Sequence, residues 1–293
     1  MPTLTVNRRE VKLTNLDRIL WPDVGLTKHD LIRYYIEVAP YLLPHLKGRL
    51  LVVQRFPEGI EGEGFYQKNI PESAPPWLRT HQVEHQEGKK TRYLIADSIE
   101  ALVWLGNQAC LELHPWLSPV DRLENPDFAV FDLDPMEDST YEDVCRAALL
   151  IKEILDRLQL RCYPKLSGGA GLQLYLPLQP QYSYEQSRTF VELICRQVQA
   201  LLPEITTVER KVNQRRGKLY LDYLQNVFGK TLAAVYSPRP RPGAPVSIPL
   251  DWSEVAACSP RPGSITLQNI MPRLKEKGDL FAPVLTDKQK LPL

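Results

Sequence analysis

The chain has 293 residues, of which 43% are hydrophobic, and its 36 basic and 35 acidic residues leave a net charge of +1. This balance excludes a uniformly basic nucleic-acid binder, although it leaves local basic patches open. No apolar run approaches the ~18 residues that a membrane span needs. The N-terminus lacks a signal-peptide pattern, and the 5 cysteines form no C-x-x-C pair. We therefore expect a cytoplasmic protein with no membrane contact, disulfide framework or zinc site.

The first elements along the chain are short strands and helices. The pattern predicts an edge strand over residues 5–12, a helix that Thr27 caps, and a buried strand over residues 50–56. Lys28 stands at the first helical position and Arg18 lies just upstream, so two cations would lie beside free backbone N–H groups. That arrangement is a candidate phosphate site. The alternative is a pair of ordinary surface charges.

An aromatic segment follows a glycine-rich loop. Phe65, Tyr66 and Lys68 combine two adjacent rings with a cation, which can stack bases and hold a phosphate. The same pattern also arises when such rings are split between core and surface. Paired strands near residues 80–86 and 92–96 and a helix from Ser98 come next, followed by His114 at a strand-like end. A lone histidine there is more often structural than catalytic.

The central stretch is the apolar run of residues 128–131, which ends in Asp132, Leu133, Asp134 and Pro135. Side chains alternate across a strand, so the two aspartates share a face. Their Cα atoms lie roughly 6.5–7 Å apart on an ideal strand, and their carboxylates can converge on a pair of divalent metals about 3.5–4 Å apart. The alternative is a strand end followed by an acidic turn.

Beyond the central strand we expect a long helix to about residue 158, strands over 161–166 and 171–176, and a capped helix over 183–202. The loop of residues 167–170 joins the two strands. Its glycines expose backbone N–H groups that can cradle phosphate oxygens, although Gly-Gly also simply makes hairpins. A short helix over residues 267–275 and a frayed tail from residue 286 complete the expected elements.

The segment of residues 210–241 contains one acid, Asp222, among many cations. A lone carboxylate among cations is usually a salt-bridge partner, but it also suits a third metal ligand surrounded by groups that neutralise a triphosphate. The basic residues of the segment are Arg210, Lys211, Arg215, Arg216, Lys218, Lys230, Arg239 and Arg241.

A series of motifs in register resembles the polymerase domain of bacterial DNA ligase D, within the archaeo-eukaryotic primase superfamily. The resemblance spans nearly the whole chain. Its motifs are TNLDRILWP (14–22), GLTK (25–28), FYQKN (65–69), LELH (111–114), FDLDP (131–135), SGGAGL (167–172), DYLQN (222–226) and YSPRPRPGAPV (236–246).

The resemblance implies an α+β, primase-type fold with a mixed β-sheet core, an RRM-like catalytic half and surrounding helices. It implies a single primase–polymerase domain over residues 1–293. An N-terminal lobe (1–115) would hold the DNA-end-binding elements, and a catalytic lobe (116–293) would hold the metal and nucleotide site. Either the chain works alone beside separate ligase and Ku proteins, or it is an excised module.

The same resemblance assigns roles to individual residues. Asp132, Asp134 and Asp222 would hold two Mn²⁺ or Mg²⁺ ions and carry catalysis. The DNA 5′-phosphate would be bound by Arg18 and Lys28, and the template by Phe65, Tyr66 and Lys68. The incoming NTP or dNTP would be bound by His114, Ser167, Gln173, Arg215, Lys230 and Arg239.

Two positions depart from the family's S-G-x-K-G-L-H pattern. The usual lysine is Ala170 and the usual histidine is Gln173, which strand alternation turns away from Leu172 and toward the metals. A third departure is Arg18, where a lysine is more usual, although a guanidinium suits phosphate at least as well. We expect weaker nucleotide binding rather than a dead enzyme.

The resulting hypothesis is a template-dependent nucleotidyltransferase that fills gaps or ends at 5′-phosphorylated DNA breaks during non-homologous end joining, with ribonucleotides accepted. Its expected partners are DNA, nucleotides, Ku and a separate ligase, and its expected location is cytoplasmic and nucleoid-associated. Two alternatives stay open. One is a catalytically weak DNA-end-binding module, and the other is a two-metal phosphodiesterase, because three aspartates alone do not distinguish hydrolysis from transfer.

Overall fold

The computed structural model describes residues 2–7, 9–84 and 88–292, and the chain divides into two compact units. Unit 1 comprises Met1–Trp116, Leu232–Val246 and Thr266–Glu276, and unit 2 comprises Leu117–Thr231, Ser247–Ile265 and Lys277–Leu293. Each unit is described by itself. The expected division of one domain into lobes 1–115 and 116–293 stays a prediction.

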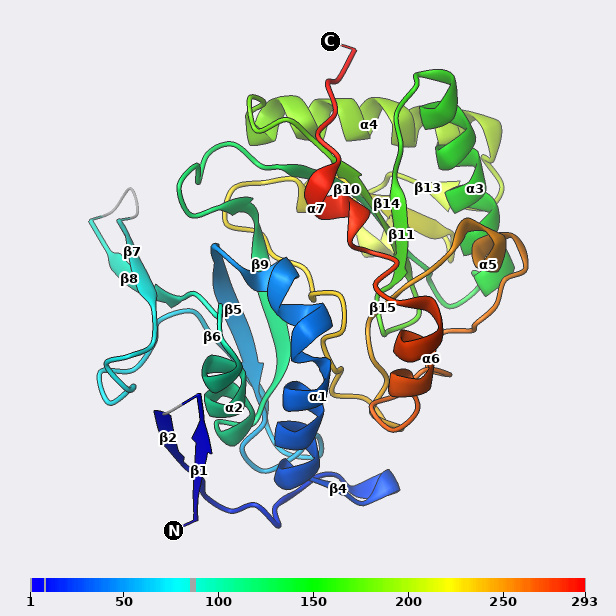
Figure 1. Ribbon diagram of the computed structural model, residues 1–293. Helices are drawn as coiled ribbons and strands as arrows, with labels where there is room; N and C mark the ends of the chain where they lie inside the picture. Colours follow the sequence, from blue (N-terminus) through cyan, green and yellow to red (C-terminus); the bar gives the residue numbers. More distant parts are fainter. Residues whose placement is uncertain (1, 8, 85–87, 293) are drawn as a thin grey trace. The chain divides into compact units, whose positions relative to one another are not determined.

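Unit 1 is built on a sheet with the strand order β6-β5-β8-β7, and β9 pairs with β5 (Figure 1). Helix α1 packs against α2, where a Cβ added at Gly106 would lie 3.0 Å from Ile32. The elements of this unit are β1 (Thr3–Val6), β2 (Arg9–Lys12), β3 (Ile19–Trp21), β4 (Leu26–Thr27), α1 (Lys28–Leu46), β5 (Arg49–Arg55), β6 (Phe65–Gln67), β7 (Thr80–Glu84), β8 (Lys90–Leu94), α2 (Ile99–Asn107), β9 (Cys110–Pro119) at the boundary and most of α6 (Ile270–Lys277).

Unit 2 is built on a sheet with the order β13-β14-β10-β12-β11-β15, antiparallel except for the β13–β14 pair. The central strand β10 pairs with β12 on one side and β14 on the other, and helices α3 and α4 pack against it. Its elements are β10 (Phe128–Asp134), α3 (Tyr141–Arg157), β11 (Tyr163–Leu166), β12 (Leu172–Pro177), α4 (Tyr184–Leu201), β13 (Thr206–Thr207), β14 (Leu219–Asp222), β15 (Ile248–Pro249), α5 (Trp252–Ala256) and α7 (Pro283–Thr286).

The long helices begin where side-chain caps satisfy their first backbone N–H groups. Thr27, Thr140 and Ser183 each form a capping box with the residue three positions later, at the starts of α1, α3 and α4. The residues that face the core recur at helical spacing, as in the buried stripe of α3 from Val144 to Leu155. These local signals are why the expected helices are confirmed.

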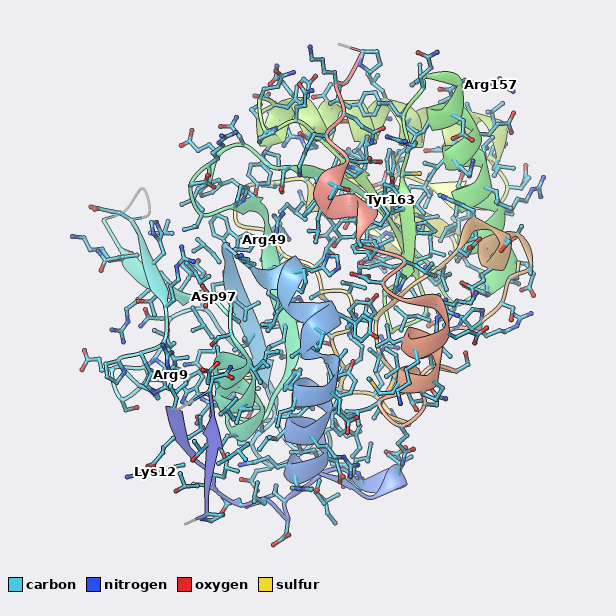
Figure 2. All side chains as sticks on the ribbon, viewed as in Figure 1. Arg9, Lys12, Arg49, Asp97, Arg157 and Tyr163 are labelled. Atoms are coloured by element: carbon cyan, nitrogen blue, oxygen red, sulfur yellow. The ribbon has the colours of Figure 1, made fainter. Side chains whose placement is uncertain are left out.

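The two ends of the chain differ from expectation. The strand expected over residues 5–12 is divided between β1 (Thr3–Val6) and β2 (Arg9–Lys12), which pair as a hairpin, and Asn7 has a positive φ of 45°; residue 8 lies outside the described residues. The tail from residue 286 is packed rather than frayed. Tyr163, labelled in Figure 2, donates its hydroxyl to Asp287, and the backbone of Leu291 donates to the Tyr182 hydroxyl at 2.8 Å. Strand β11 and its neighbours therefore hold the C-terminal segment.

Among the described residues, no helix is both long enough and apolar enough to span a bilayer.

Candidate metal centre and nucleic-acid-binding residues

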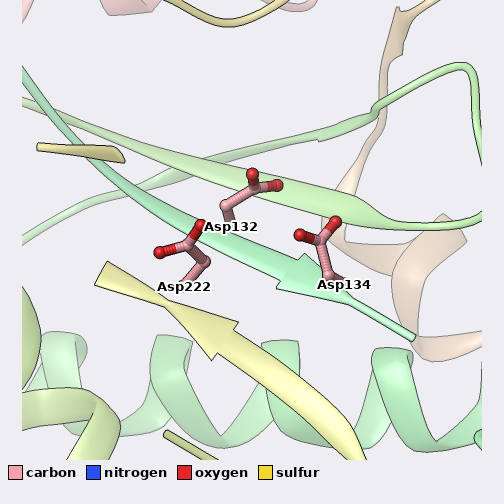
Figure 3. Close-up of side chains that lie close together, drawn as sticks. All are labelled: Asp132, Asp134 and Asp222. Carbon is pink, nitrogen blue, oxygen red and sulfur yellow. The ribbon is translucent and has the colours of Figure 1, made fainter. Parts of the chain in front are cut away.

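Three carboxylates meet at the centre of the unit 2 sheet. Asp132 and Asp134 project from β10 and Asp222 from the end of β14, all toward the same side (Figure 3). Asp132 and Asp222 are direct partners in the β10–β14 register. One ligand atom from each of the three residues lies within 4.8 Å of the others. Asp132 and Asp134 therefore share one face of β10, as expected, and Asp222 lies beside them.

Hydrogen bonds fix the orientation of Asp222. Its Oδ1 accepts from the backbone N–H of Leu224 at 2.8 Å and from the Tyr220 hydroxyl at 3.2 Å, while its Oδ2 accepts from Gln225 Nε2 at 2.9 Å. Asn226 then bonds both backbone groups of Val130 in β10, accepting at 2.8 Å and donating at 2.7 Å. The DYLQN segment therefore acts as a clamp that holds Asp222 against the central strand.

Asp132 is the most buried of the three carboxylates, with 5% of its surface exposed. Burial raises its pKa well above the ordinary value, and the neighbouring Asp134 carboxylate raises it further, while a hydrogen bond from Gln173 opposes both effects. Three converging carboxylates with one of them buried form an all-oxygen donor set that a hard divalent cation satisfies. The residues present therefore fit a Mg²⁺ or Mn²⁺ centre.

The loop between β11 and β12 lies beside the end of the central strand. Leu172, the first residue of β12, pairs with Leu133. A Cβ added at Gly171 would lie 2.3 Å from the Leu133 carbonyl oxygen, so only glycine allows this approach. Inside the loop, the backbone N–H of Gly169 donates to Ser167 Oγ at 3.1 Å. This places Ser167 and the exposed Ala170 at the same end of β10 as the carboxylates.

Tyr220 lies between Arg215 and Asp222 and contacts both residues. The guanidinium carbon of Arg215 is 3.6 Å from the centre of the Tyr220 ring, whose hydroxyl bonds Asp222. Two of its nitrogens donate to the backbone carbonyls of Glu209 and Arg210, both at 3.0 Å. Lys230 is exposed on the segment that follows the clamp. Unit 2 thus holds seven of the nine expected metal and nucleotide residues, Lys230 included.

The remaining expected nucleotide residues, His114 and Arg239, lie in unit 1, where a buried glutamate joins them. Glu112 accepts from His114 Nε2 at 2.6 Å and from Arg239 Nε at 2.5 Å. Burial alone would raise the pKa of Glu112, but the hydrogen bond from His114 and the charge of Arg239 outweigh it and lower that pKa. The Glu112 carboxylate therefore stays ionised and orients both partners.

The expected template aromatics are exposed and adjoin this cluster. Tyr66 is 59% exposed and packs edge-on against His114 with ring centres 5.7 Å apart. Phe65 is 45% exposed, and the Arg55 guanidinium lies 5.4 Å from its ring centre. Lys68 is exposed beyond the end of β6. Two large exposed rings beside cations are the kind of surface on which bases can stack, so the template role of these residues stays a prediction.

The expected phosphate-binding pair lies at the start of α1. Lys28 is 6% exposed and its Nζ donates to the Thr14 carbonyl at 3.0 Å, while Arg18 pairs with Glu58. Burial lowers the pKa of Lys28, and the nearby Arg18 and Arg55 charges lower it further. An anion bound here would relieve this crowding of cations.

One part of that expectation is wrong, because the first N–H groups of α1 are not free. The backbone N–H of Lys28 donates to the Arg18 carbonyl at 2.8 Å, and that of His29 donates to the Leu16 carbonyl at 3.0 Å. Asp30 N–H is taken by the Thr27 cap. The N–H groups of Lys28, His29 and Asp30 are therefore not offered to a phosphate.

Sequence reasoning missed three residues that organise these groups. Glu112 stands two positions before His114, so strand alternation could have placed both on one face. Asn226 ends the DYLQN motif (222–226), and no role was predicted for it. Lys165 is fully buried in β11, and its ammonium donates to Ser247 Oγ at 2.9 Å, which no local pattern signals.

Comparison with known proteins assigns this arrangement to a family. The family described as LigD, primase-polymerase domain, matches residues 27–281. The bifunctional non-homologous end joining protein LigD of Bacillus subtilis is 37% identical over 285 residues, 97% of this chain and 46% of that protein. The multifunctional non-homologous end joining protein LigD of Mycolicibacterium smegmatis is 36% identical over 282 residues, 94% of this chain and 36% of that protein. The chain thus spans less than half the length of these curated relatives.

A solved structure gives the same assignment. The polymerase domain of Mycobacterium tuberculosis ligase D, in complex with DNA, superposes with a TM-score of 0.88 and 31% sequence identity, and the match covers 95% of this chain and 99% of that one. The expected α+β fold of the archaeo-eukaryotic primase type is confirmed. The chain therefore belongs to the LigD primase–polymerase domain family of metal-dependent nucleotidyltransferases, DNA-directed polymerases of the primase type.

Proposed function

We propose that this chain extends a primer at a 5′-phosphorylated gap or break in DNA, using two divalent cations held by Asp132, Asp134 and Asp222. The convergence of these three carboxylates on the face of β10 and β14 is the observation that carries the proposal. The relatives are named for non-homologous end joining, and the solved relative is in complex with DNA. Both names support the same substrate class for this chain.

In this mechanism each group of residues has a distinct task. Two bound cations would activate the primer 3′-hydroxyl and neutralise the charge that develops on pyrophosphate. Ser167, Gln173, Arg215 and Lys230 would bind the triphosphate from unit 2. His114 and Arg239, which Glu112 orients within unit 1, stay predicted nucleotide-binding residues. Phe65 and Tyr66 would stack the template bases, with Lys68 on its backbone.

The 5′-phosphate assignment predicts opposite effects for two neighbouring substitutions. Alanine at both Arg18 and Lys28 should erase the preference for phosphorylated over unphosphorylated gapped DNA, at a cost of roughly 1–3 kcal/mol. Glu58→Gln should instead tighten binding of the phosphorylated form, because it removes the carboxylate that pairs with Arg18. Fluorescence anisotropy with matched duplexes measures both effects. A preference that survives the double substitution would place the phosphate elsewhere.

The departures at Ala170 and Gln173 predict weak nucleotide binding that can be improved. Ala170→Lys, in an exposed loop beside Ser167, should lower the KM for the nucleotide several-fold with a smaller effect on kcat. The reason is that charge-assisted hydrogen bonds are roughly twice as strong as neutral ones. Ala170→Gln is the neutral control of similar size. Steady-state extension at saturating DNA gives the values, and an unchanged KM would mean that this loop does not contact the triphosphate.

Primer extension on a gapped, 5′-phosphorylated duplex tests the function, with NTP and dNTP compared in Mn²⁺ and in Mg²⁺. We expect metal-dependent extension in which ribonucleotides are accepted. Tight binding of the duplex without extension would favour the end-binding module instead. The participation of Ku and a separate ligase, and a cytoplasmic, nucleoid-associated location, stay predictions.

A further inference from the structure

Gln173 presents an unusual buried group to the carboxylate cluster. It lies in β12 directly opposite Asp132, and only 4% of its surface is exposed. Its Nε2 donates to Asp132 Oδ1 at 3.0 Å, whereas its Oε1 has no hydrogen-bond partner within the part of the chain that the structure describes. A buried acceptor without a partner costs roughly 1–3 kcal/mol. The amide is therefore held only through its contact with Asp132, and among the described residues no hydrogen bond at the oxygen opposes its rotation.

The amide can present this oxygen to the cluster without moving its backbone. Half a turn about the terminal torsion exchanges Nε2 and Oε1 and leaves the shape of the side chain unchanged. The oxygen would then take the place of a nitrogen that lies 3.0 Å from Asp132 Oδ1. Two adjacent ligands of an octahedral Mg²⁺ with 2.0–2.1 Å bonds are also about 3.0 Å apart. The observed spacing therefore suits two oxygens that share one cation.

We propose that Gln173 is a further ligand of the divalent cation bound by Asp132, to which it contributes its amide oxygen. The inference rests on the metal centre of the proposed function and extends it by one residue. A neutral oxygen completes the coordination without adding a fourth negative charge to carboxylates that already repel one another. It also keeps the donor set entirely oxygen, which suits Mg²⁺ and Mn²⁺ better than softer metals.

The next residue along the same row of the sheet limits where a cation can lie. Lys165 pairs with Gln173 in the β11–β12 register, is fully buried, and donates from its ammonium to Ser247 Oγ at 2.9 Å. The Lys165 nitrogen presents hydrogen-bond donors on that side and not a ligand oxygen, which disfavours a metal beyond Gln173. Gln173 is therefore the last oxygen in this row that can reach the cation from the β12 side.

Pulsed electron paramagnetic resonance of bound Mn²⁺ tests the proposal on the nucleotide-free protein. In Gln173→His, an imidazole nitrogen would enter the coordination sphere, so we expect a ¹⁴N coupling to Mn²⁺ that is absent from wild type. Gln173→Leu should weaken the Kd for Mn²⁺ about tenfold, as loss of a supporting contact at a metal site does. Gln197→His, on the exposed face of α4, is the control and should change neither the spectrum nor the Kd.

The outcomes separate this inference from the proposed function. A wild-type protein that binds no Mn²⁺ would overturn the metal centre and the inference with it. If wild type binds Mn²⁺ but Gln173→His shows no new nitrogen coupling and Gln173→Leu keeps the same Kd, the metal centre stands and the ligand role of Gln173 is wrong. The histidine variant keeps a hydrogen-bond donor for Asp132, so its spectrum remains informative even if the leucine variant fails to fold.

Discussion

Asp132→Asn should abolish primer extension and yet make the metal-free protein more stable at neutral pH. The substitution removes a buried carboxylate of the proposed metal centre, and we expect a loss of roughly three orders of magnitude in rate, equivalent to several kcal/mol of transition-state stabilisation. The amide keeps an oxygen that Gln173 can contact. Stability should rise because the wild-type carboxylate is buried beside Asp134, and ionising it there is unfavourable.

The pH dependence of this difference follows from the raised pKa of Asp132. Between the ordinary value of 3.8 and the raised folded value, the folded protein holds a proton that the unfolded chain has released. The free energy of unfolding of the wild type therefore falls as pH rises through that window. The asparagine variant has no carboxyl to ionise at this position, so its free energy of unfolding does not fall for this reason. We expect equal stability near the ordinary value and an advantage for the variant at pH 8, on the order of 1 kcal/mol or about 2–4 °C in Tm.

Thermal unfolding in chelator from pH 4 to pH 8 measures the effect. Added Mn²⁺ should raise the Tm of wild type and leave that of the variant nearly unchanged, because only a protein that binds the ion gains stability from it. A variant that is less stable than wild type at pH 8 in chelator would contradict the assigned electrostatics of the cluster.

Glu112→Gln should produce the largest change in unit 1. Glu112 accepts from His114 and Arg239 through its two different oxygens and is only 2% exposed. A glutamine keeps one acceptor oxygen, so it turns an NH₂ donor toward one of the two partners and removes the negative charge beside Arg239. Breaking such a buried pair costs roughly 3–5 kcal/mol of unfolding free energy. Because the folded pKa of Glu112 is lowered, its contribution is present above the ordinary value of 4.5 and is lost as pH falls through the folded value. The deficit of the variant should therefore shrink in acid.

The same variant should raise the KM for the nucleotide, because His114 and Arg239 would lose the carboxylate that orients them. Glu37→Gln, an exposed glutamate on α1 in the same unit, is the matched control and should change neither stability nor KM. A double-mutant cycle that combines Glu112→Gln with Arg239→Gln measures the coupling free energy between these two residues and separates it from a general loss of packing. If the two substitutions are additive, Glu112 does not position Arg239.

Local signals in the sequence predicted the helices and the acidic pair well. The caps at Thr27 and Ser183 and the alternation that puts Asp132 and Asp134 on one face depend only on neighbours within a few residues. The short strands were not predicted correctly: β1 and β2 were expected as one strand, and β13 and β15 were not expected. Two-residue strands such as β15 exist because a neighbouring strand offers hydrogen-bond partners, not because of their own composition.

The finer geometry of the site depends on contacts between distant residues. The sequence shows that Asp222 lies among cations. It does not reveal that Asn226, four residues later, bonds the backbone of Val130 in β10, 96 positions away, and so holds the Asp222 segment against that strand. Nor could it show that the first N–H groups of α1 are taken by the segment around Arg18. The unpaired oxygen of Gln173 emerges only from the strand register of the folded sheet. Local propensity carries no information on such pairings.

The most direct test of the proposed polymerase is templated addition at a one-nucleotide gap with a 5′-phosphate, using the four templating bases and one nucleotide at a time. The account predicts that only the complementary nucleotide is added, that each addition releases one pyrophosphate, and that chelation of the metal stops the reaction. Shortening of the primer without added nucleotide would instead identify a phosphodiesterase. Tight binding with no addition under any condition would leave only a DNA-end-binding module, and either result would contradict the proposed polymerase.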